Sequence, residues 1–336
     1  MSSASNRLAI VGAGSWGTAL AIILSSRFER IRLWAHENDL VQRMADTRIN
    51  DIFLPGYRLP LNVEPVSDLG LVLADANVVL SAMPSRFARP LYRAMLPHLH
   101  SGMRFVSATK GLETGSLARM SEVAREVISE RFEARMAVLS GPTFAREVAR
   151  GEPTALVISS IDQELAASLQ REFSGPTFRL YTNDDPTGVE IGASLKNTIA
   201  IGAGICHGLG LGNNSMAALI TRGLVEITRL AVAMGGHAPT LAGLAGLGDL
   251  VLTCTGDLSR NRTVGIELAK GRKLSDIVSS MTMIAEGVET TYAAVDLAQR
   301  FNVDLPITQQ MNSILRGGRS PRDAIRDLME RNLKTE

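Results

Sequence analysis

The first half of the chain alternates short apolar runs with segments in which apolar residues recur at helical spacing. The apolar runs predict strands near residues 7–12, 31–35, 77–83, 104–108, 136–140, 154–159 and 178–182. The segments between them predict helices near residues 15–27, 37–46, 86–98, 116–130, 143–150 and 162–173. Several of the strands are apolar almost throughout, which is typical of a parallel sheet covered on both faces. The alternation therefore predicts a Rossmann-like, doubly wound α/β sheet with right-handed crossovers.

The pattern changes after about residue 187, where the strand signals stop. The remainder predicts helices near residues 188–210, 213–235, 239–246, 260–271, 274–280, 286–300, 305–315 and 320–330. Turn signals rich in glycine and proline separate several of them, as in "GGHAPT" at 235–240. A length of 336 residues also favours two domains over one. We expect an α/β domain at residues 1–187 and an all-α domain at residues 188–336.

Composition narrows the class of protein without identifying it. Apolar residues make up 45% of the chain, charged residues make up 21%, and the net charge is +1. This is an ordinary soluble composition, and it gives no electrostatic argument for binding nucleic acid or inserting stably into a membrane. The two cysteines, Cys206 and Cys254, lack metal-ligand spacing. Such sparse use favours a reducing compartment, with both cysteines as small buried hydrophobes and no metal site.

The apolar run that begins at Leu8 has two interpretations. Because Arg7 precedes it, the run resembles the start of a signal peptide. It also contains Gly12, Gly14 and Gly17, which follow a predicted strand and open a predicted helix. Glycines at this spacing allow a tight turn, a close approach of the backbone to a pyrophosphate, and packing of helix on strand. The free amides of the helix start then face the phosphates, so we prefer dinucleotide binding.

The sequence leaves the choice of dinucleotide open. The acidic residue that would bind the adenosine ribose is expected at the end of the second strand. Ala35 and His36 stand there instead, and Glu37 follows. His36 could contact a 2′-phosphate or simply be exposed in a turn, and Glu37 could face the ribose. NADPH, NADH or both are compatible with this pattern.

Residues that could bind or react with a substrate follow two further predicted strands. Lys110 follows the strand at 104–108, and in this fold such a lysine points into the crevice at the carboxyl edge of the sheet. Gly141 and Thr143 flank Pro142 where a helix begins after the strand at 136–140, and exposed amides there suit an anionic group. Surface lysines and helix starts are common, so each feature alone is ambiguous.

One lysine stands alone in a long uncharged stretch. Between Glu190 and Arg222, Lys196 is the only permanently charged side chain. Burying an unpaired ammonium is costly, and the cost is often relieved by a lowered pKa. A single lysine kept in such a run therefore needs an explanation that the apolar pattern alone does not give.

The segment at 245–265 gathers polar side chains of the kinds that bind phosphate. Asp249 and Thr253 are four residues apart, so one helical turn would place them on the same face. Ser259, Arg260 and Asn261 lie where a helix is predicted to begin. Guanidinium, amide and hydroxyl donors at a helix start suit phosphate binding, although an N-capped surface turn has the same residues.

Taken together, these motifs resemble one family. "GAGSWGTALA", "ATKGLE", "SGPTFA", "LKN", "GLGDLVLTCT", "SRNR" and "AEGVET" occur in the order found in NAD(P)-dependent glycerol-3-phosphate dehydrogenases of the bacterial type. The resemblance extends from residue 7 to about residue 330. It implies reversible reduction of dihydroxyacetone phosphate by NADPH or NADH to sn-glycerol 3-phosphate, the backbone of membrane phospholipids. It also implies a cytoplasmic homodimer with an N-terminal dinucleotide domain and a helical catalytic domain.

The resemblance also implies roles for individual residues. Cofactor contacts are implied at Gly12, Gly14, Ser15, Trp16, Gly17, His36, Lys110, Ala145, Arg260, Ile284 and Glu286. Substrate contacts are implied at Lys110, Gly141, Thr143, Lys196, Asp249, Ser259, Arg260 and Asn261. Lys196 is implied as the catalytic residue, with Lys110 and Asp249 beside it. Relatives often carry arginine at the position of His36 and serine at that of Thr143.

Two alternatives keep part of this pattern. Reductases of the 6-phosphogluconate, 3-hydroxyacid or ketopantoate type also pair a dinucleotide domain with a helical domain that carries a catalytic lysine. "SGPTFA" and the pair Arg260 and Asn261 favour the glycerol phosphate enzyme. A non-catalytic NAD(H) sensor would keep the glycines, but it would not need Lys196, Asp249 and Arg260 together.

Overall fold

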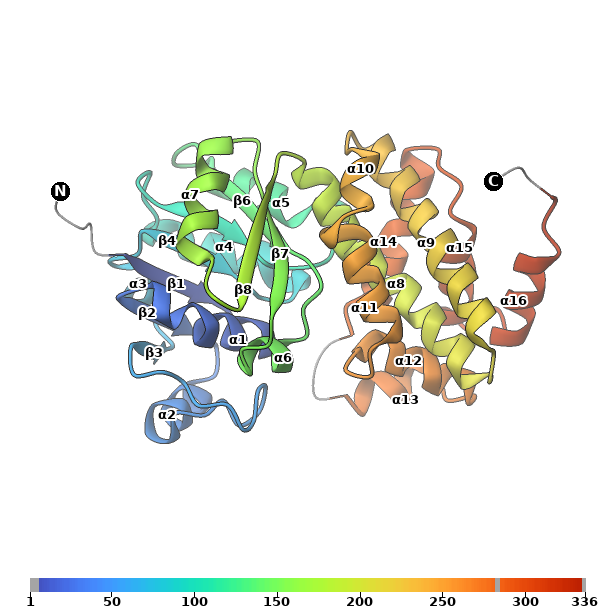
Figure 1. Cartoon of the computed structure of the whole chain (residues 1–336), viewed down its shortest axis with the longest axis horizontal. Coiled ribbons are helices and arrows are strands. Elements are labelled where there is room, and N and C mark those ends of the chain that lie inside the picture. Colours follow the sequence, from blue (N-terminus) through green and yellow to red (C-terminus); the bar gives the residue numbers. More distant parts are fainter. Residues whose placement is uncertain (1–5, 282–284, 334–336) are drawn as a thin grey trace.

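One sheet organises the N-terminal half of the computed structural model, which describes residues 6–281 and 285–333. Within these residues eight strands pair in the order β3-β2-β1-β4-β5-β6-β7-β8. They are β1 (Arg7–Val11), β2 (Arg30–Trp34), β3 (Val63–Val66), β4 (Val78–Ser81), β5 (Arg104–Ser107), β6 (Arg135–Ser140), β7 (Thr154–Ser159) and β8 (Phe178–Asn183). The accompanying helices are α1 (Ser15–Leu24), α2 (Asn38–Thr47), α3 (Leu69–Leu73), α4 (Ala88–Met95), α5 (Met120–Ile128), α6 (Ala145–Ala149) and α7 (Gln163–Phe173). Helices cover both faces, as Figure 1 shows, so the predicted doubly wound domain is confirmed.

The C-terminal half is helical, also as predicted (Figure 1). Its helices are α8 (Pro186–Gly208), α9 (Asn213–Ala233), α10 (Ala238–Leu241), α11 (Asp249–Thr255), α12 (Arg260–Ala269), α13 (Leu274–Ser279), α14 (Gly287–Arg300), α15 (Pro306–Leu315) and α16 (Pro321–Met329). The long helix α8 leaves the sheet domain and becomes the centre of this half, because α9, α11, α12 and α14 all pack around it. Every residue from Gly188 to Cys206 is therefore buried.

One strand departs from the expected pattern of parallel strands joined by crossovers. β7 runs antiparallel to β6, with Val138 opposite Ser159. The connection between them contains only the five-residue helix α6, which packs beside α1. The chain therefore turns back beside β6 instead of crossing over the sheet. β8 then runs parallel to β7 after the longer helix α7, so the far edge is mixed, as in many large α/β sheets.

Two short elements were not predicted. β3 has the sequence VEPV, in which Glu64 and Pro65 interrupt the apolar pattern, and the five-residue helix α3 follows it. β3 lies at the edge of the sheet and pairs only with β2. An edge strand tolerates a proline because one side of it needs no ladder hydrogen bonds.

Several helix boundaries also differ from prediction. The helix expected at 239–246 is wrong: α10 ends at Leu241, residues Leu244–Gly248 form a π-type turn, and the unpredicted helix α11 follows. The helix expected at 116–130 begins only at Met120, because Leu117 has a left-handed backbone with φ of 64°. The segment 86–98 is α4 flanked by 3₁₀ turns at Ser85–Phe87 and Leu96–His98.

One stretch, Ala238–Thr255, is long and apolar enough to cross a membrane by composition alone, with a mean hydropathy of 1.3. It consists of α10, a break at residues 242–243, the π-type turn and α11, which follows that turn directly. It also carries Asp249, which is fully buried against two lysines. These features favour the interpretation that it is a core segment of the helical half.

Helices α8 and α12 approach each other closely enough to require glycine on both. A Cβ on Gly204 would lie 2.0 Å from the carbonyl oxygen of Arg262, and one on Gly265 would lie 2.0 Å from that of Ile201. Backbone atoms cannot yield to such a contact. The two glycines therefore fix the distance of α12, and of the Arg260 segment at its start, from the helix that carries Lys196.

We predict that Gly204→Ala lowers the free energy of unfolding by about 1–3 kcal/mol or more, because the added methyl forces the two helices apart. Gly202→Ala is the matched control in the same helix, since the nearest atoms to its Cβ would be Met311 Sδ at 3.4 Å and Leu219 at 3.5 Å, which is ordinary contact distance. The control should be neutral, or more stable by up to about 1 kcal/mol through helix propensity. Thermal unfolding measures both, and equal melting temperatures for the two variants would contradict the prediction.

Candidate active site

The glycine turn lies where the strand order of the sheet reverses. β1 pairs with β2 on one side and with β4 on the other, so a crevice opens at their carboxyl ends. Gly12 follows β1 with φ of +119°, a conformation that only glycine adopts readily. Helix α1 then begins at Ser15, with Trp16 in its first turn and Gly14 as its N-cap.

Each of the three glycines has the surroundings that dinucleotide binding requires. A Cβ on Gly12 would lie 2.7 Å from the carbonyl oxygen of Ala82, and one on Gly17 would lie 1.9 Å from that of Gly12. Around Gly14 no atom of the described residues lies within 4 Å of the position a Cβ would take, so the backbone is open to an incoming group. Trp16 Nε1 is a buried donor without a hydrogen-bond partner among the described residues. The turn therefore fits a pyrophosphate at the start of α1.

Asn50 supports this turn from a distant part of the chain. Its amide nitrogen donates to the carbonyl oxygen of Ala13 and to Thr18 Oγ1, both at 2.8 Å, and the residue is fully buried. This role of Asn50 was not predicted, because nothing local connects a loop residue after α2 with a turn 37 positions earlier.

The residues predicted around the rest of the cofactor lie near the same edge of the sheet. His36 is exposed after β2, and its ring centroid is 6.1 Å from that of Trp34. Glu37 is exposed and precedes the first turn of α2. Ala145 begins α6, which packs beside α1. Ile284 lies outside the described residues.

The centre of the candidate site is one carboxylate shared by two lysines. Lys110, which follows β5, donates to Asp249 Oδ2 at 2.8 Å. Lys196, from the middle of α8, donates to Asp249 Oδ1 of the same carboxylate. Asp249 is fully buried and Lys196 is 5% exposed. The two lysines come from segments far apart in the chain, and they meet on a residue from a third element at the boundary of the two halves.

Thr253 completes the contacts of Lys196. Its hydroxyl accepts a hydrogen bond from Lys196 Nζ at 2.9 Å and donates to the backbone oxygen of Asp249 at 2.6 Å. The prediction that Asp249 and Thr253 share a helical face is confirmed by α11. With the carboxylate and the hydroxyl both fixed on one helix, the direction of the ammonium is also fixed.

Burial and charge act on Lys196 in opposite directions. Burial lowers the pKa of Lys196, and the positive charge of Lys110 lowers it further, while Asp249 raises it. Desolvation is the largest contribution, so we place this pKa below the ordinary value of a lysine. Cys254 next to Thr253 is a free buried thiol whose pKa burial raises to about 12, which makes it an inert hydrophobe, as predicted.

The start of α12 brings the predicted phosphate-binding residues to the same region. Ser259 caps this helix, with Oγ accepting from Arg262 N at 3.3 Å. Asn261 Oδ1 accepts from the backbone N–H of Gly287 at 3.0 Å, so it ties α12 to the start of α14. Glu286 precedes that start. Burial raises the pKa of Glu286 to about 7, while the positive charges of Arg260, Lys110 and Lys196 lower it.

Gly141 and Thr143 approach the lysines from β6. The carbonyl oxygen of Gly141 accepts from Lys110 Nζ at 3.4 Å, and Thr143 Oγ1 donates to the same oxygen at 3.2 Å. Gly141 has φ of +150°, and a Cβ there would lie 3.0 Å from Leu156 Cα. The segment after β6 therefore lies beside Lys110, as expected of neighbouring strand ends.

The charges around Asp249 favour an anion. Two ammonium groups share one carboxylate, so the fully ionised group of three carries a charge of +1 in a buried place. An uncompensated buried charge is unfavourable, and a bound anion or a developing oxyanion offsets it. A lysine with a lowered pKa beside such an oxyanion can also deliver a proton.

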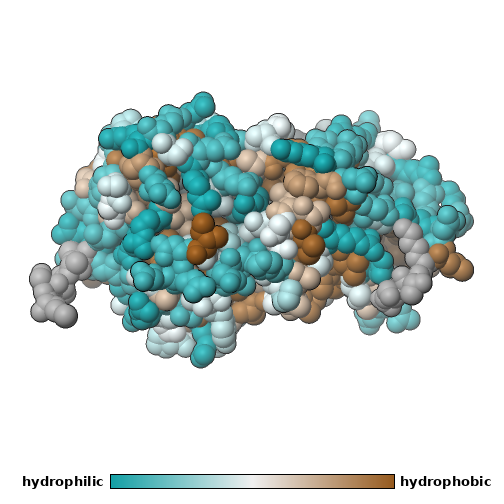
Figure 2. All heavy atoms as spheres, turned by 90° about the horizontal axis from the view of Figure 1, so that it is seen from above, coloured by the Kyte–Doolittle hydropathy of each residue, from teal (hydrophilic) through white to brown (hydrophobic). Residues whose placement is uncertain are grey.

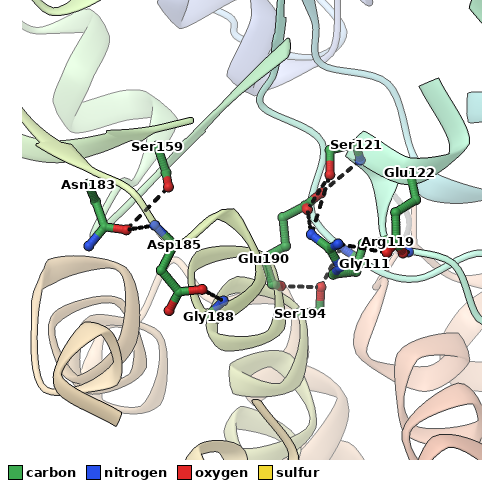
Figure 3. A network of polar contacts seen from close by, with 10 residues as sticks. All are labelled: Gly111, Arg119, Ser121, Glu122, Ser159, Asn183, Asp185, Gly188, Glu190 and Ser194. Atoms are coloured by element: carbon green, nitrogen blue, oxygen red, sulfur yellow. Dashed lines mark hydrogen bonds and ion pairs between the residues drawn. The ribbon is translucent and has the colours of Figure 1, made fainter. Parts of the chain in front are cut away.

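A second polar network joins the two halves near the lysines and is shown in Figure 3. Glu190, one turn into α8, accepts from the backbone N–H of Ser121 at 2.8 Å and from Arg119 at 2.7 Å. Ser194 Oγ accepts from the backbone N–H of Gly111 at 3.1 Å. No role was predicted for Glu190, which the sequence shows only as the charged residue that bounds the uncharged stretch.

Comparison with known proteins gives one consistent result. The family described as NAD-dependent glycerol-3-phosphate dehydrogenase matches with its N-terminal part over residues 7–166 and with its C-terminal part over residues 185–326. The chain is 58% identical over 333 residues to the glycerol-3-phosphate dehydrogenase (NAD(P)+) of Koribacter versatilis, covering 98% of this chain and 99% of that protein. It is 52% identical to that of Syntrophotalea carbinolica, with 98% and 99% covered. The crystal structure of the glycerol-3-phosphate dehydrogenase of Coxiella burnetii is similar with a TM-score of 0.93 and 40% identity, covering 98% of this chain and 100% of that one.

The glycine turn gives a test of dinucleotide binding. We predict that Gly14→Ala leaves the melting temperature unchanged, because no atom lies within 4 Å of the added Cβ. The same methyl should weaken binding of NADH and NADPH by about tenfold or more, because it occupies the space into which the pyrophosphate must fit. Fluorescence titration of both dinucleotides measures the effect. Unchanged affinity for both would rule out this turn as the pyrophosphate site.

Proposed function

The chain belongs to the NAD-dependent glycerol-3-phosphate dehydrogenase family, and on this premise we propose that it reduces dihydroxyacetone phosphate to sn-glycerol 3-phosphate with NADH or NADPH. The observation that carries the assignment of roles is the carboxylate of Asp249 with Lys110 on one oxygen and Lys196 on the other. It provides positive charge and a proton donor in a single buried place.

The reaction needs both of these at the C2 oxygen of the ketone. When bound, the dinucleotide supplies the hydride, and negative charge grows on the C2 oxygen as the carbonyl is reduced. Lys196 stabilises this charge with its ammonium and then protonates the oxygen. Lys110 adds a second positive charge, and Asp249 and Thr253 orient the ammonium group of Lys196. In the reverse reaction neutral Lys196 removes the proton from the hydroxyl.

The phosphate of the substrate is assigned to the start of α12. Arg260 offers a planar guanidinium, Asn261 an amide, and Ser259 stands at the N-cap, where the free amides of the helix begin. Gly141 and Thr143 are assigned to the substrate beside Lys110. Binding energy from the phosphate then holds the distant carbonyl in place for reaction.

The dinucleotide is assigned to the crevice at β1 and β4. Gly12, Gly14 and Gly17 carry the pyrophosphate, with Ser15 and Trp16 at the start of α1. His36, Ala145, Ile284 and Glu286 are assigned to the cofactor by their motifs. The open space at Gly14 and the unpartnered Trp16 Nε1 support this placement.

We also propose that the enzyme is a cytoplasmic homodimer whose product supplies glycerophospholipid synthesis. Cys206 and Cys254 are both free and buried, which suits a reducing compartment. Figure 2 shows hydrophobic surface gathered over part of the helical half. Exposed large apolar residues of the helical half include Val232, Leu247 and Val251, and such surface favours burial against a second copy.

The assigned role of Lys196 predicts how the rate depends on pH. Only the ammonium form can donate, so the rate of ketone reduction should fall as pH rises through the pKa of Lys196. Because burial lowers that pKa, the fall should begin below the ordinary lysine value of about 10.4. Oxidation of glycerol 3-phosphate needs the neutral amine and should rise with pH over the same interval. Steady-state kcat in both directions, with NADH and with NADPH, measures this.

Lys196→Met is the control for this prediction. It should lower kcat by about 10²–10⁴-fold and remove the pH-dependent limb, while dinucleotide affinity stays within about twofold. A loss smaller than about tenfold, or an unchanged limb in the variant, would refute the role of Lys196. Absence of dihydroxyacetone phosphate reduction by the unaltered protein would refute the proposed function itself.

Arg260→Ala tests the assignment of the phosphate. We expect KM for dihydroxyacetone phosphate to rise by about tenfold or more, since a charged hydrogen bond to phosphate is lost. Activity toward unphosphorylated dihydroxyacetone should change much less. The measurement is the ratio of kcat/KM for the two ketones, and a ratio equal to that of the unaltered enzyme would place the phosphate elsewhere.

A further inference from the structure

The segment that carries Lys110 folds back and lies against the helical half. After β5, residues 110–121 form a narrow loop in which Leu112 and Arg119 make an isolated antiparallel bridge. Leu112 is 3% exposed and belongs to the apolar core of the helical half. The backbone N–H of Gly111, next to Lys110, donates to Ser194 Oγ of α8 at 3.1 Å. We call residues 110–121 the Lys110 loop.

Glu190 holds the other end of the Lys110 loop. Its carboxylate accepts three hydrogen bonds there: from Ser121 N at 2.8 Å, from Ser121 Oγ at 2.5 Å and from Arg119 Nη1 at 2.7 Å. Ser121 lies in the first turn of α5, so Glu190 supplies an acceptor to the free amides of that helix from outside it. Glu190 is 4% exposed, and these contacts satisfy both of its oxygens.

A short route of contacts connects Glu190 with Lys110. Arg119, bound by Glu190, is bridged directly to Leu112, and Leu112 is two residues from Lys110. Glu190 and Ser194 lie one turn apart on α8, and Lys196 follows two residues later. Helix α8, which carries Lys196, therefore also binds both ends of the Lys110 loop.

We propose that Glu190 is a positioning residue for the reaction, which anchors the Lys110 loop to α8 so that Lys110 and Lys196 meet on Asp249. The proposal rests on the proposed function through the roles of the two lysines. Lys110 has a flexible side chain and reaches Asp249 only if its backbone is held at the boundary of the two halves. Without Glu190, Arg119 and the Ser121 amide lose a buried partner and this boundary loosens.

The chain contains a matched control for the loss of such a carboxylate. Glu226 of α9 is 2% exposed and accepts from the backbone N–H groups of Ile307 and Thr308 and from Thr308 Oγ1. It therefore caps α15 as Glu190 caps α5, but entirely within the helical half. Removing Glu226 should disturb folding in the same way without moving Lys110.

The test is a double-mutant cycle of Glu190→Ala with Lys110→Met. We expect Glu190→Ala to lower kcat/KM for dihydroxyacetone phosphate by about tenfold or more, and to change the affinity for NADH by less than about twofold. In the Lys110→Met background the same change should cost less than about threefold, because the positioned group is already absent. Glu190→Gln keeps one acceptor oxygen but turns its NH2 group toward the remaining donors, so it should restore only part of the lost activity.

Each other outcome counts against the proposal. Equal losses in the two backgrounds, or a Glu226→Ala variant that loses as much kcat/KM as Glu190→Ala, would reduce Glu190 to a purely structural residue. If Glu190→Ala does not fold, Ser121→Ala removes one donor to Glu190 and enters the same cycle with the same criterion of non-additivity. Failure of the unaltered enzyme to reduce dihydroxyacetone phosphate would refute the proposed function instead.

Discussion

The carboxylate of Asp249 is the interaction on which the arrangement of the site depends. It is fully buried and touches Lys110 from the sheet domain and Lys196 from the helical domain. Burying ions is unfavourable unless each is paired and hydrogen-bonded. Here the single negative charge of Asp249 pairs with two lysines, so the three residues together keep a net positive charge when all are ionised. Glu286 offsets part of that charge through its electrostatic interaction with both lysines, and an anionic substrate can offset the rest.

Such a group persists only on a rigid scaffold, and α8 provides it. Helices α9, α11, α12 and α14 pack most closely around it, and Gly204 and Gly265 allow α12 to approach at backbone contact. This packing prevents Lys196 from reaching water by a small movement, which would relieve its desolvation and return its pKa to the ordinary range. The apolar run around Lys196 is therefore part of its chemistry, because the same side chains that bury it lower its pKa.

The features that the sequence predicts well are those with a local physical cause. Short, largely apolar runs predict seven of the strands, and the isolation of Lys196 in an uncharged stretch marks it as unusual, while its catalytic role comes from the family resemblance. The sequence does not predict β3, because Glu64 and Pro65 interrupt its apolar pattern at a sheet edge. It does not predict the direction of β7 either, because strand direction depends on the path of the connection from β6. The pairings of Glu190 with Arg119 and of Asn50 with Ala13 join distant residues, which a single sequence cannot bring together.

The strand order explains why the assigned site runs in one line along the sheet. β1, β4, β5 and β6 are adjacent and parallel, so their carboxyl ends share one edge. That edge carries, in order, the glycine turn, the close contact of Ala82 with Gly12, then Lys110, then Gly141. β7 is the first strand that runs the opposite way, and its carboxyl end points to the other edge. The sheet can therefore extend the site only as far as β6, and the remaining contacts must come from α8, α11 and α12. The parallel edge supplies Lys110, while the second lysine and the carboxylate that both lysines share come from the helical half.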